Sequence, residues 1–283
     1  MPDQPPPVFN RSGLAALSDL QTSSWRELFC LLEESQAEFL AHEKEFRSPE
    51  YIWPRDPLHT WSRVWEYPYV YHHLRQWRQN HPAAASPLVV DVGSGVTFFP
   101  FAVARLGYQV VCTDVDPVCQ RDLNRAIEFM SAAPGSVEFR PTDGSILPFK
   151  DQEADCLYCI SVLEHLEAFQ ILVAEMNRIL QPGGLLILTI DLDPKGQTGF
   201  GVEKQKLLRE ILEPDFADLY PARTIHPADI LEACRGPCPM KKCWPTHCWQ
   251  VFRRRIVKRL LRRKPLPLPE YHLSIEAVIM TKR

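Results

Sequence analysis

A glycine-rich turn that follows an apolar run is the first stretch of the chain with the composition to bind a ligand. Residues 89–97 read VVDVGSGVT, so the apolar run ends at Asp91, and Gly93 and Gly95 follow. Glycine lets the backbone turn tightly and approach a ligand closely. The third glycine of a dinucleotide fingerprint is absent, because valine and threonine follow Gly95. The motif alone predicts a ligand-binding turn between a strand and a helix, without naming the ligand.

A second carboxylate stands where a nucleoside could be held. Asp114 ends the next apolar run, in the sequence VVCTDVDP, about 20 residues after Asp91. A carboxylate at the end of the second strand can accept both hydroxyls of a ribose. The alternative is that Asp114 caps a helix, but Asp116, directly before Pro117, is better placed for that.

Further polar residues follow later apolar runs. Asp191 and Asp193, in TIDLD, could orient an acceptor hydroxyl or amine, or they could belong to a plain turn. His226 and Asp229, in TIHPADIL, are either a polar pair or the start of a capped helix. Loops beyond the carboxyl ends of strands form the ligand crevice of open α/β sheets, which makes the first pair relevant.

The elements that would position these residues alternate along the chain. Short apolar runs predict strands, and amphipathic stretches predict helices between them. The expected strands are 88–91, 109–114, 137–140, 155–160, 185–190 and one from 272 on, and the expected helices are 98–106, 118–130 and 166–180. This alternation predicts a doubly wound α/β fold, with a mostly parallel sheet covered on both faces. Cys156 and Cys159 would then point to opposite faces of one strand, which argues against a redox pair.

Four signatures in their usual order resemble the class I S-adenosylmethionine (SAM)-dependent methyltransferases, of the methyltransferase domain 11 kind. They are DVGSGVT, Asp114, TDGSILPF at 142–149, and ADCLYCISVLEHL followed by LQPGGLLILTI. The resemblance covers about residues 86–192 and implies a seven-stranded Rossmann-like sheet with SAM as the cofactor. It implies that the glycine loop faces the methionine part of SAM, that Asp114 holds the ribose and that Asp143 accepts from the adenine amino group. The full set of implied cofactor-binding residues is Asp91, Gly93, Ser94, Gly95, Asp114, Val115, Asp143, Gly144 and Ile160.

The resemblance also bears on catalysis and metals. His165 is a candidate general base, and the alternative is a hydrogen-bonded histidine at a helix start. Small-RNA methyltransferases bind a divalent metal through a Glu-x-x-Glu-His motif, but here Ser161 replaces the first glutamate, so we expect no metal there. The cysteines and histidine at 234–248 do not have the paired spacing of structural zinc sites either.

The chain is expected to divide into two parts. Residues 1–85 would form a flexible tail, a helix from a capping box at Ser24 and Glu27 to about Phe46, and an aromatic-rich helical lid. Residues 86–283 would form the SAM-binding domain, with a basic insertion at about 233–270. Residues 233–269 hold eleven Lys or Arg and no Asp or Glu. The helix expected at 249–264 could contact a membrane surface or an anionic acceptor, or simply present a solvated basic face.

These features predict a methyltransferase that acts on a small molecule or a glycan by in-line displacement. The alternatives are a nicotinamide-dependent oxidoreductase and a nucleic-acid methyltransferase. The absence of a base-methylating Asn-Pro-Pro-Tyr motif and a net charge of −3 argue against nucleic acid as a partner. No stretch has the pattern of a secretory signal or a membrane span, so a cytoplasmic protein is expected.

Overall fold

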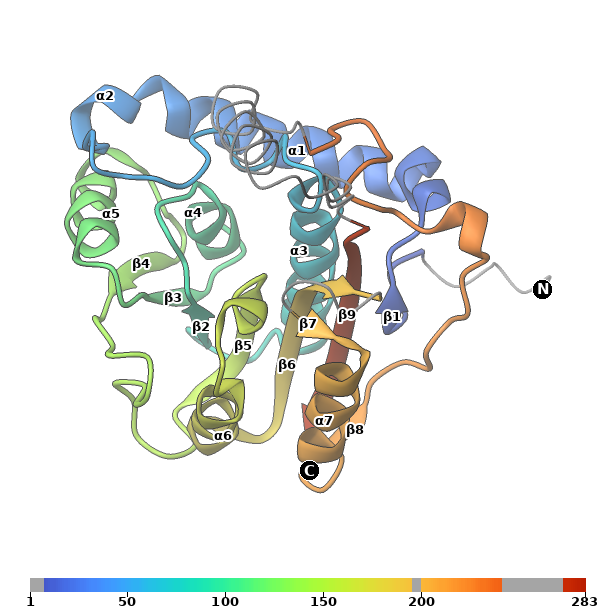
Figure 1. The fold of residues 1–283 in the computed structure, drawn as a ribbon. Helices are drawn as coiled ribbons and strands as arrows, with labels where there is room; N and C mark the ends of the chain where they lie inside the picture. Colours follow the sequence, from blue (N-terminus) through green and yellow to red (C-terminus); the bar gives the residue numbers. More distant parts are fainter. Residues whose placement is uncertain (1–7, 195–199, 241–271) are drawn as a thin grey trace, which may run out of the picture.

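A computed structural model describes residues 8–194, 200–240 and 272–283 of the chain. Its centre is a mixed sheet whose strand order is β1-β9-β6-β5-β2-β3-β4, with β7 paired to β6 and β8 paired to β9 (Figure 1). The parallel strands are β2 (Leu88–Val92), β3 (Gln109–Thr113), β4 (Ser136–Phe139), β5 (Ala154–Ile160) and β6 (Leu180–Asp193). The last strand, β9 (Ser274–Lys282), is antiparallel to β6.

The sheet has nine strands in the described part of the chain, where seven were expected. Three of the nine match none of the six strands predicted by residue range: β1 (Gly13–Leu14), β7 (Phe200–Gly201) and β8 (Phe216–Asp218). Strands β1 and β7 are only two residues long. The short strand β8 (Phe216–Asp218) and β1 pair with different stretches of β9. The expected α/β fold is confirmed, and the extra strands arise because short segments add hydrogen bonds along an otherwise open edge.

Helices cover both faces of the sheet, as the alternation of elements predicts. One face packs against α1 (Ser23–Ala41), α3 (Arg63–Asn80), α4 (Phe99–Ala104) and α5 (Pro117–Phe129). The other packs against α6 (Phe169–Ile179) and α7 (Val202–Leu212). Cys156 lies in the first apolar core and Cys159 in the second, so the expectation that they point to opposite faces is confirmed.

The N-terminal part differs from expectation in two respects. Helix α1 begins after Thr22, whose side chain accepts a hydrogen bond from the Trp25 amide at 3.2 Å, so the capping box expected at Ser24 is wrong. Helix α1 ends at Ala41, and Phe46 ends a separate short helix, α2 (Glu43–Phe46).

The tail expected at 1–22 is firmly packed where it is described. Phe9 is buried, and the buried Arg11 and Asp19 form an ion pair. Trp65 Nε1 of α3 donates to Asp19 at 2.8 Å, and the Ala15 amide donates to Ile275 of β9 at 3.0 Å. These contacts join the N-terminal residues to the core of the sheet, because buried polar groups need partners.

The order of the strands creates one crevice. The chain moves from β2 to β3 and β4 on one side and then returns to β5 and β6 on the other. The reversal falls between β2 and β5, and open α/β sheets bind ligands at the carboxyl ends of strands at such a point. None of the helices in the described segments is both long and apolar enough to cross a membrane.

Candidate active site

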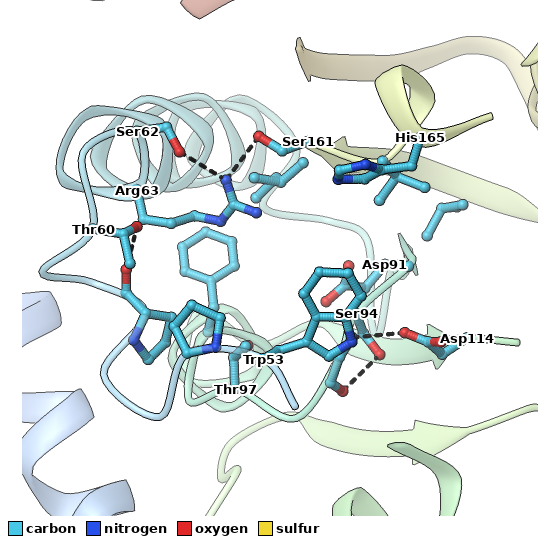
Figure 2. Close-up of a pocket in the computed structure, with 18 of the residues that line it drawn as sticks. Trp53, Thr60, Ser62, Arg63, Asp91, Ser94, Thr97, Asp114, Ser161 and His165 are labelled. Atoms are coloured by element: carbon cyan, nitrogen blue, oxygen red, sulfur yellow. Dashed lines mark hydrogen bonds between the residues drawn. The ribbon is translucent and has the colours of Figure 1, made fainter. Parts of the chain in front are cut away.

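A cavity of about 1070 Å³ opens at the carboxyl ends of the parallel strands. Its floor is the glycine loop after β2 and the segments that follow β3 and β5. The segment before α3 forms the opposite wall and includes Trp53, Thr60 and Ser62 (Figure 2). Arg63 and Tyr67, from the first turns of α3, also line the cavity. The cavity therefore brings together the sequence signatures and the aromatic-rich N-terminal segment. The proposed function of that segment as a lid stays a prediction.

The glycine loop has the geometry that its composition predicts. Gly93 has a φ of 75°, and a Cβ added to it would lie 2.5 Å from a methyl group of Val162. The amides of Gly93 and Ser94 both donate to the Thr113 carbonyl, at 2.8 and 3.0 Å. The loop is thus fixed against the end of β3, and no side chain larger than hydrogen fits at position 93.

Asp114 connects the loop with the next helix. Its Oδ2 accepts from the Gly95 amide and its Oδ1 from the Asp116 amide, both at 2.9 Å. Asp116 caps α5 by accepting from the Val118 amide at 2.8 Å. The expectation that Asp116, and not Asp114, is the helix cap is therefore confirmed. Asp114 remains in the cavity wall, and its contact with a ribose stays a prediction.

Among the implied cofactor-binding residues Val115, Asp143 and Gly144, two line the cavity and one does not. Gly144 and Val115 are in the wall, and a Cβ on Gly144 would lie 3.1 Å from a methyl group of Val115. Asp143 is exposed and lies outside the lining, and its Oδ1 accepts from the Ser145 amide and hydroxyl and from the Ile146 amide. The bond from the Ser145 amide is the main cause that lowers the pKa of Asp143. Contact of Asp143 with adenine stays a prediction.

Asp91 is a buried carboxyl group at the end of β2, in the floor of the cavity. The Tyr158 hydroxyl donates to its Oδ2 at 2.9 Å. Burial raises the pKa of Asp91 to about 8, although this hydrogen bond acts in the opposite direction. Ser94 and Ile160, which the resemblance also implies in the site, line the cavity and are largely buried.

The candidate base His165 lies in the cavity wall, on the short 3-10 helix Leu163–His165. Burial and the positive charge of Arg63 lower its pKa. The Trp53 ring centroid lies 6.2 Å from that of His165 (Figure 2). A neutral imidazole in this position is available as a proton acceptor. The assignment of His165 as a catalytic base stays a prediction.

The sequence reasoning did not single out a charged pair on α3 that reaches the cavity. Arg63 and Glu66 form an ion pair, and Glu66 is completely buried. Arg63 Nη1 donates to the Ser161 hydroxyl at 2.7 Å (Figure 2). This hydroxyl lies 2.8 Å from Glu66 Oε1. The spacing of three residues between opposite charges at the start of a helix could have indicated the Arg63–Glu66 pair in the sequence. No local pattern indicated that the pair contacts Ser161, which follows β5.

Ser161 and two further carboxyl groups complete this cluster. Ser161 has a φ of 49°, in the left-handed region, where a residue with a Cβ is strained. Its hydroxyl lies 3.4 Å from Asp191 Oδ1, and the Asp191 amide donates to Glu164 Oε1 at 3.2 Å. Strained residues persist where surrounding contacts hold them and often occur at functional sites. Asp191 lines the cavity, as its position after an apolar run suggested.

The second polar pair from the sequence has a structural function. His226 caps the 3-10 helix Pro227–Asp229 by accepting from the Ala228 amide at 3.2 Å. Asp229 accepts from the amide and hydroxyl of Ser18, at 2.9 and 2.6 Å. Neither residue lines the cavity, so the capped-helix alternative holds.

The cysteine-rich segment is described only in part. Cys234 lies with Glu232 and His272, their ligand atoms all within 4.8 Å of one another, whereas Cys238 lies in the cavity wall. The remaining cysteines and histidine, and the basic helix expected at 249–264, lie outside the described residues. The expected membrane contact and the option of an anionic acceptor depend on that helix and stay predictions.

Comparisons with known proteins agree with this site. Residues 90–188 match the family model described as a methyltransferase domain. An uncharacterized methyltransferase of Mycobacterium avium is 33% identical over 129 residues, 44% of this chain and 49% of that protein. One from Mycolicibacterium paratuberculosis is 31% identical over 155 residues, 54% and 57% of the two chains. The chain thus spans about half the length of the curated relatives that it matches.

The fold comparison extends over nearly the whole chain. The solved structure of the [4+2]-cyclase SpnF superposes with a TM-score of 0.50 at 16% identity and covers 96% of this chain and 99% of its own. That identity supports the fold alone. The glycine loop, the cavity and the match over residues 90–188 are those of a domain similar to class I SAM-dependent methyltransferases. Within the chain, the similarity to the methyltransferase domain family is confined to residues 90–188.

Proposed function

We propose that the chain transfers a methyl group from SAM to a small-molecule or glycan acceptor. The observation that carries the proposal is a cavity lined both by the cofactor signatures and by Arg63, Ser161 and Asp191. Small-molecule sites usually measure about 300–1,000 Å³. A cavity of about 1070 Å³ therefore has room for a cofactor and a small second ligand.

Two anchors hold the N-terminal segment across the cavity. The Ser48 amide and hydroxyl donate to Asp122 of α5 at 2.8 and 2.7 Å, and the Tyr51 hydroxyl accepts from the Val96 amide at 3.1 Å. Arg63 holds the other end through Ser161. A segment that is fixed on both sides of the cavity excludes water from it. It also favours a compact acceptor, because displacement at an activated methyl group depends chiefly on how the acceptor is positioned.

The charge of the wall supports SAM over a dinucleotide. Asp114 and Asp116 line the cavity, and Arg63, the one arginine that the described residues place in its wall, is already paired with Glu66. Bound SAM supplies a methyl group activated by a sulfonium cation, which an acidic wall stabilises. A pyrophosphate or a nucleic-acid backbone would meet repulsion from the same carboxylates. The described wall likewise favours an uncharged acceptor over an anionic one.

The cofactor part of the proposal is tested by calorimetric titration of the purified chain with SAM, S-adenosylhomocysteine and NAD. Both sulfur compounds should bind and raise the melting temperature, because a ligand that binds only the native state stabilises it. NAD should give neither heat nor a melting shift. Binding of NAD in place of SAM, or silence with both sulfur compounds, contradicts the proposal. Transfer of tritium from methyl-labelled SAM to mixed small acceptors then tests the activity.

A further inference from the structure

The half-buried Asp191 and the buried Glu164 are neighbouring acidic residues at the cavity. The Asp191 amide donates to Glu164 Oε1 at 3.2 Å, so the two residues are in direct contact. Asp191 lines the cavity. The other oxygen of Glu164, Oε2, is buried and has no hydrogen-bond partner among the described residues. A buried acceptor without a partner is costly, which indicates that something is bound there during function.

Among the described residues, the cation beside this pair is Arg63, which lowers the pKa of both carboxyl groups but is itself paired with Glu66. Helix α3 contributes Arg63 and Glu66, which are paired with each other, and the 3-10 helix after β5 contributes Glu164 itself and His165. Adjacent carboxylates in a buried place do not both ionise, so such a pair holds one proton near neutral pH. Burial, followed by the charge of Glu66, raises the pKa of Asp191 to about 7, and burial raises the pKa of Glu164.

We infer that Asp191 is the catalytic base that takes the proton from an acceptor hydroxyl, with Glu164 as its positioning partner. This inference rests on the proposed function and narrows its acceptor to one that is methylated on oxygen. The acceptor oxygen forms the new C–O bond, and the C–S bond breaks with its electron pair going to sulfur. The hydroxyl proton moves to the free oxygen of Asp191, so charge and atoms balance.

A hydroxyl fits this arrangement better than an amine does. A hydroxyl is a weak nucleophile until its proton leaves, and a base with a pKa near the working pH accelerates such a step by about 10²–10⁴-fold. An ammonium group beside the same pair would keep its proton, because an adjacent carboxylate favours the charged form. The strained Ser161 hydroxyl, 3.4 Å from Asp191 Oδ1, is positioned to hold the acceptor oxygen or the carboxylate in place.

The test compares the wild-type chain with Asp191→Asn, using methyl-tritiated SAM and two acceptor mixtures. One mixture contains methyl glycosides and small phenols, and the other contains primary amines. We expect label in the hydroxyl mixture and a loss of about 10²–10⁴-fold in the variant. The affinity for SAM should stay within about twofold of wild type by calorimetry. Asp218→Asn on β8, outside the cavity, is the matched control and should keep both properties.

The dependence on pH separates a base from a structural residue. The wild-type rate should rise with pH through about 7, and Asp191→Asn should lose this inflection. Glu164→Gln removes a neighbouring negative charge, so it should shift the inflection to lower pH while transfer persists. Label only in amines, or a variant Asp191→Asn that keeps more than about a tenth of the rate, overturns the inference.

Infrared spectroscopy decides the case in which neither mixture takes up label. In the difference between the wild-type and Asp191→Asn spectra, in which the absorption of the protonated Asp91 cancels, a protonated-carboxyl band should be present and should disappear around pH 7. Absence of this band overturns the inference. Failure of the proposed function is recognised separately, because the wild-type chain would then not bind SAM at all.

Discussion

Replacement of Asp114 by alanine tests the cofactor site most directly. The carboxylate accepts from the amides of Gly95 and Asp116, both at 2.9 Å, and lies in the cavity wall. The variant therefore loses two bonds that brace the glycine loop as well as the acceptor for the ribose hydroxyls. The first loss affects the stability of the protein, and the second affects only the bound state.

The two losses have different magnitudes. Hydrogen bonds to a charged group contribute about 1.5–3 kcal/mol each, so two ribose hydroxyls account for at least about 3 kcal/mol. A tenfold change in affinity corresponds to about 1.4 kcal/mol, so the dissociation constant for SAM should rise by about 100-fold or more. The braced amides lie near solvent, and their loss should lower the free energy of unfolding by about 1–2 kcal/mol.

Calorimetric titration with SAM and urea denaturation measure these two quantities on the same samples. Asp114→Asn keeps one oxygen of similar shape and should bind SAM with intermediate affinity. Glu138→Gln on the neighbouring strand β4 is exposed and serves as the control, with both quantities unchanged. The reasoning is refuted if Asp114→Ala loses stability but keeps its affinity for SAM, since Asp114 would then only brace the loop.

Three further predictions concern the residues around the cavity. Gly93→Ala should lower the free energy of unfolding by at least about 1–2 kcal/mol, because residue 93 has a φ of 75° and the added Cβ would lie 2.5 Å from Val162. In urea denaturation, the double variant Gly93→Ala with Val162→Ala should regain part of the lost stability. No recovery would argue against the steric cause. Burial raises the pKa of Asp91 from 3.8 to about 8. The contribution of protonated Asp91 to the free energy of unfolding is therefore complete below about pH 4 and is lost as the pH rises through 8. Asp91→Asn should flatten the decline of the wild-type unfolding free energy from pH 5 to 8, and curves of unfolding free energy against pH that run parallel for the two proteins would contradict this. Glu66→Ala leaves Arg63 without its buried partner and should cost about 3–5 kcal/mol in chemical denaturation; a loss below about 1 kcal/mol would mean that water replaces the carboxylate.

The features predicted correctly depend on residues close together in the sequence. The turn at Gly93, the cap at Asp116 and the opposite faces of Cys156 and Cys159 follow from backbone sterics and from the two-residue period of a strand. The start of α1 was misplaced although it is also local. Thr22, Ser23 and Ser24 are all residue types that cap helices, and only the packing of the helix selects one of them.

The sequence by itself determined the α/β class, the position of the cofactor loop and the acids at the ends of its strands, because hydrophobic periodicity and glycine act over a few residues. Tertiary structure decided what faces that loop. Arg63 and Glu66 meet Ser161 across nearly one hundred residues of chain, and no local pattern specifies such a contact. The half-buried position of Asp191 beside Glu164 is likewise a property of the fold, and the raised pKa of both carboxyl groups follows from it.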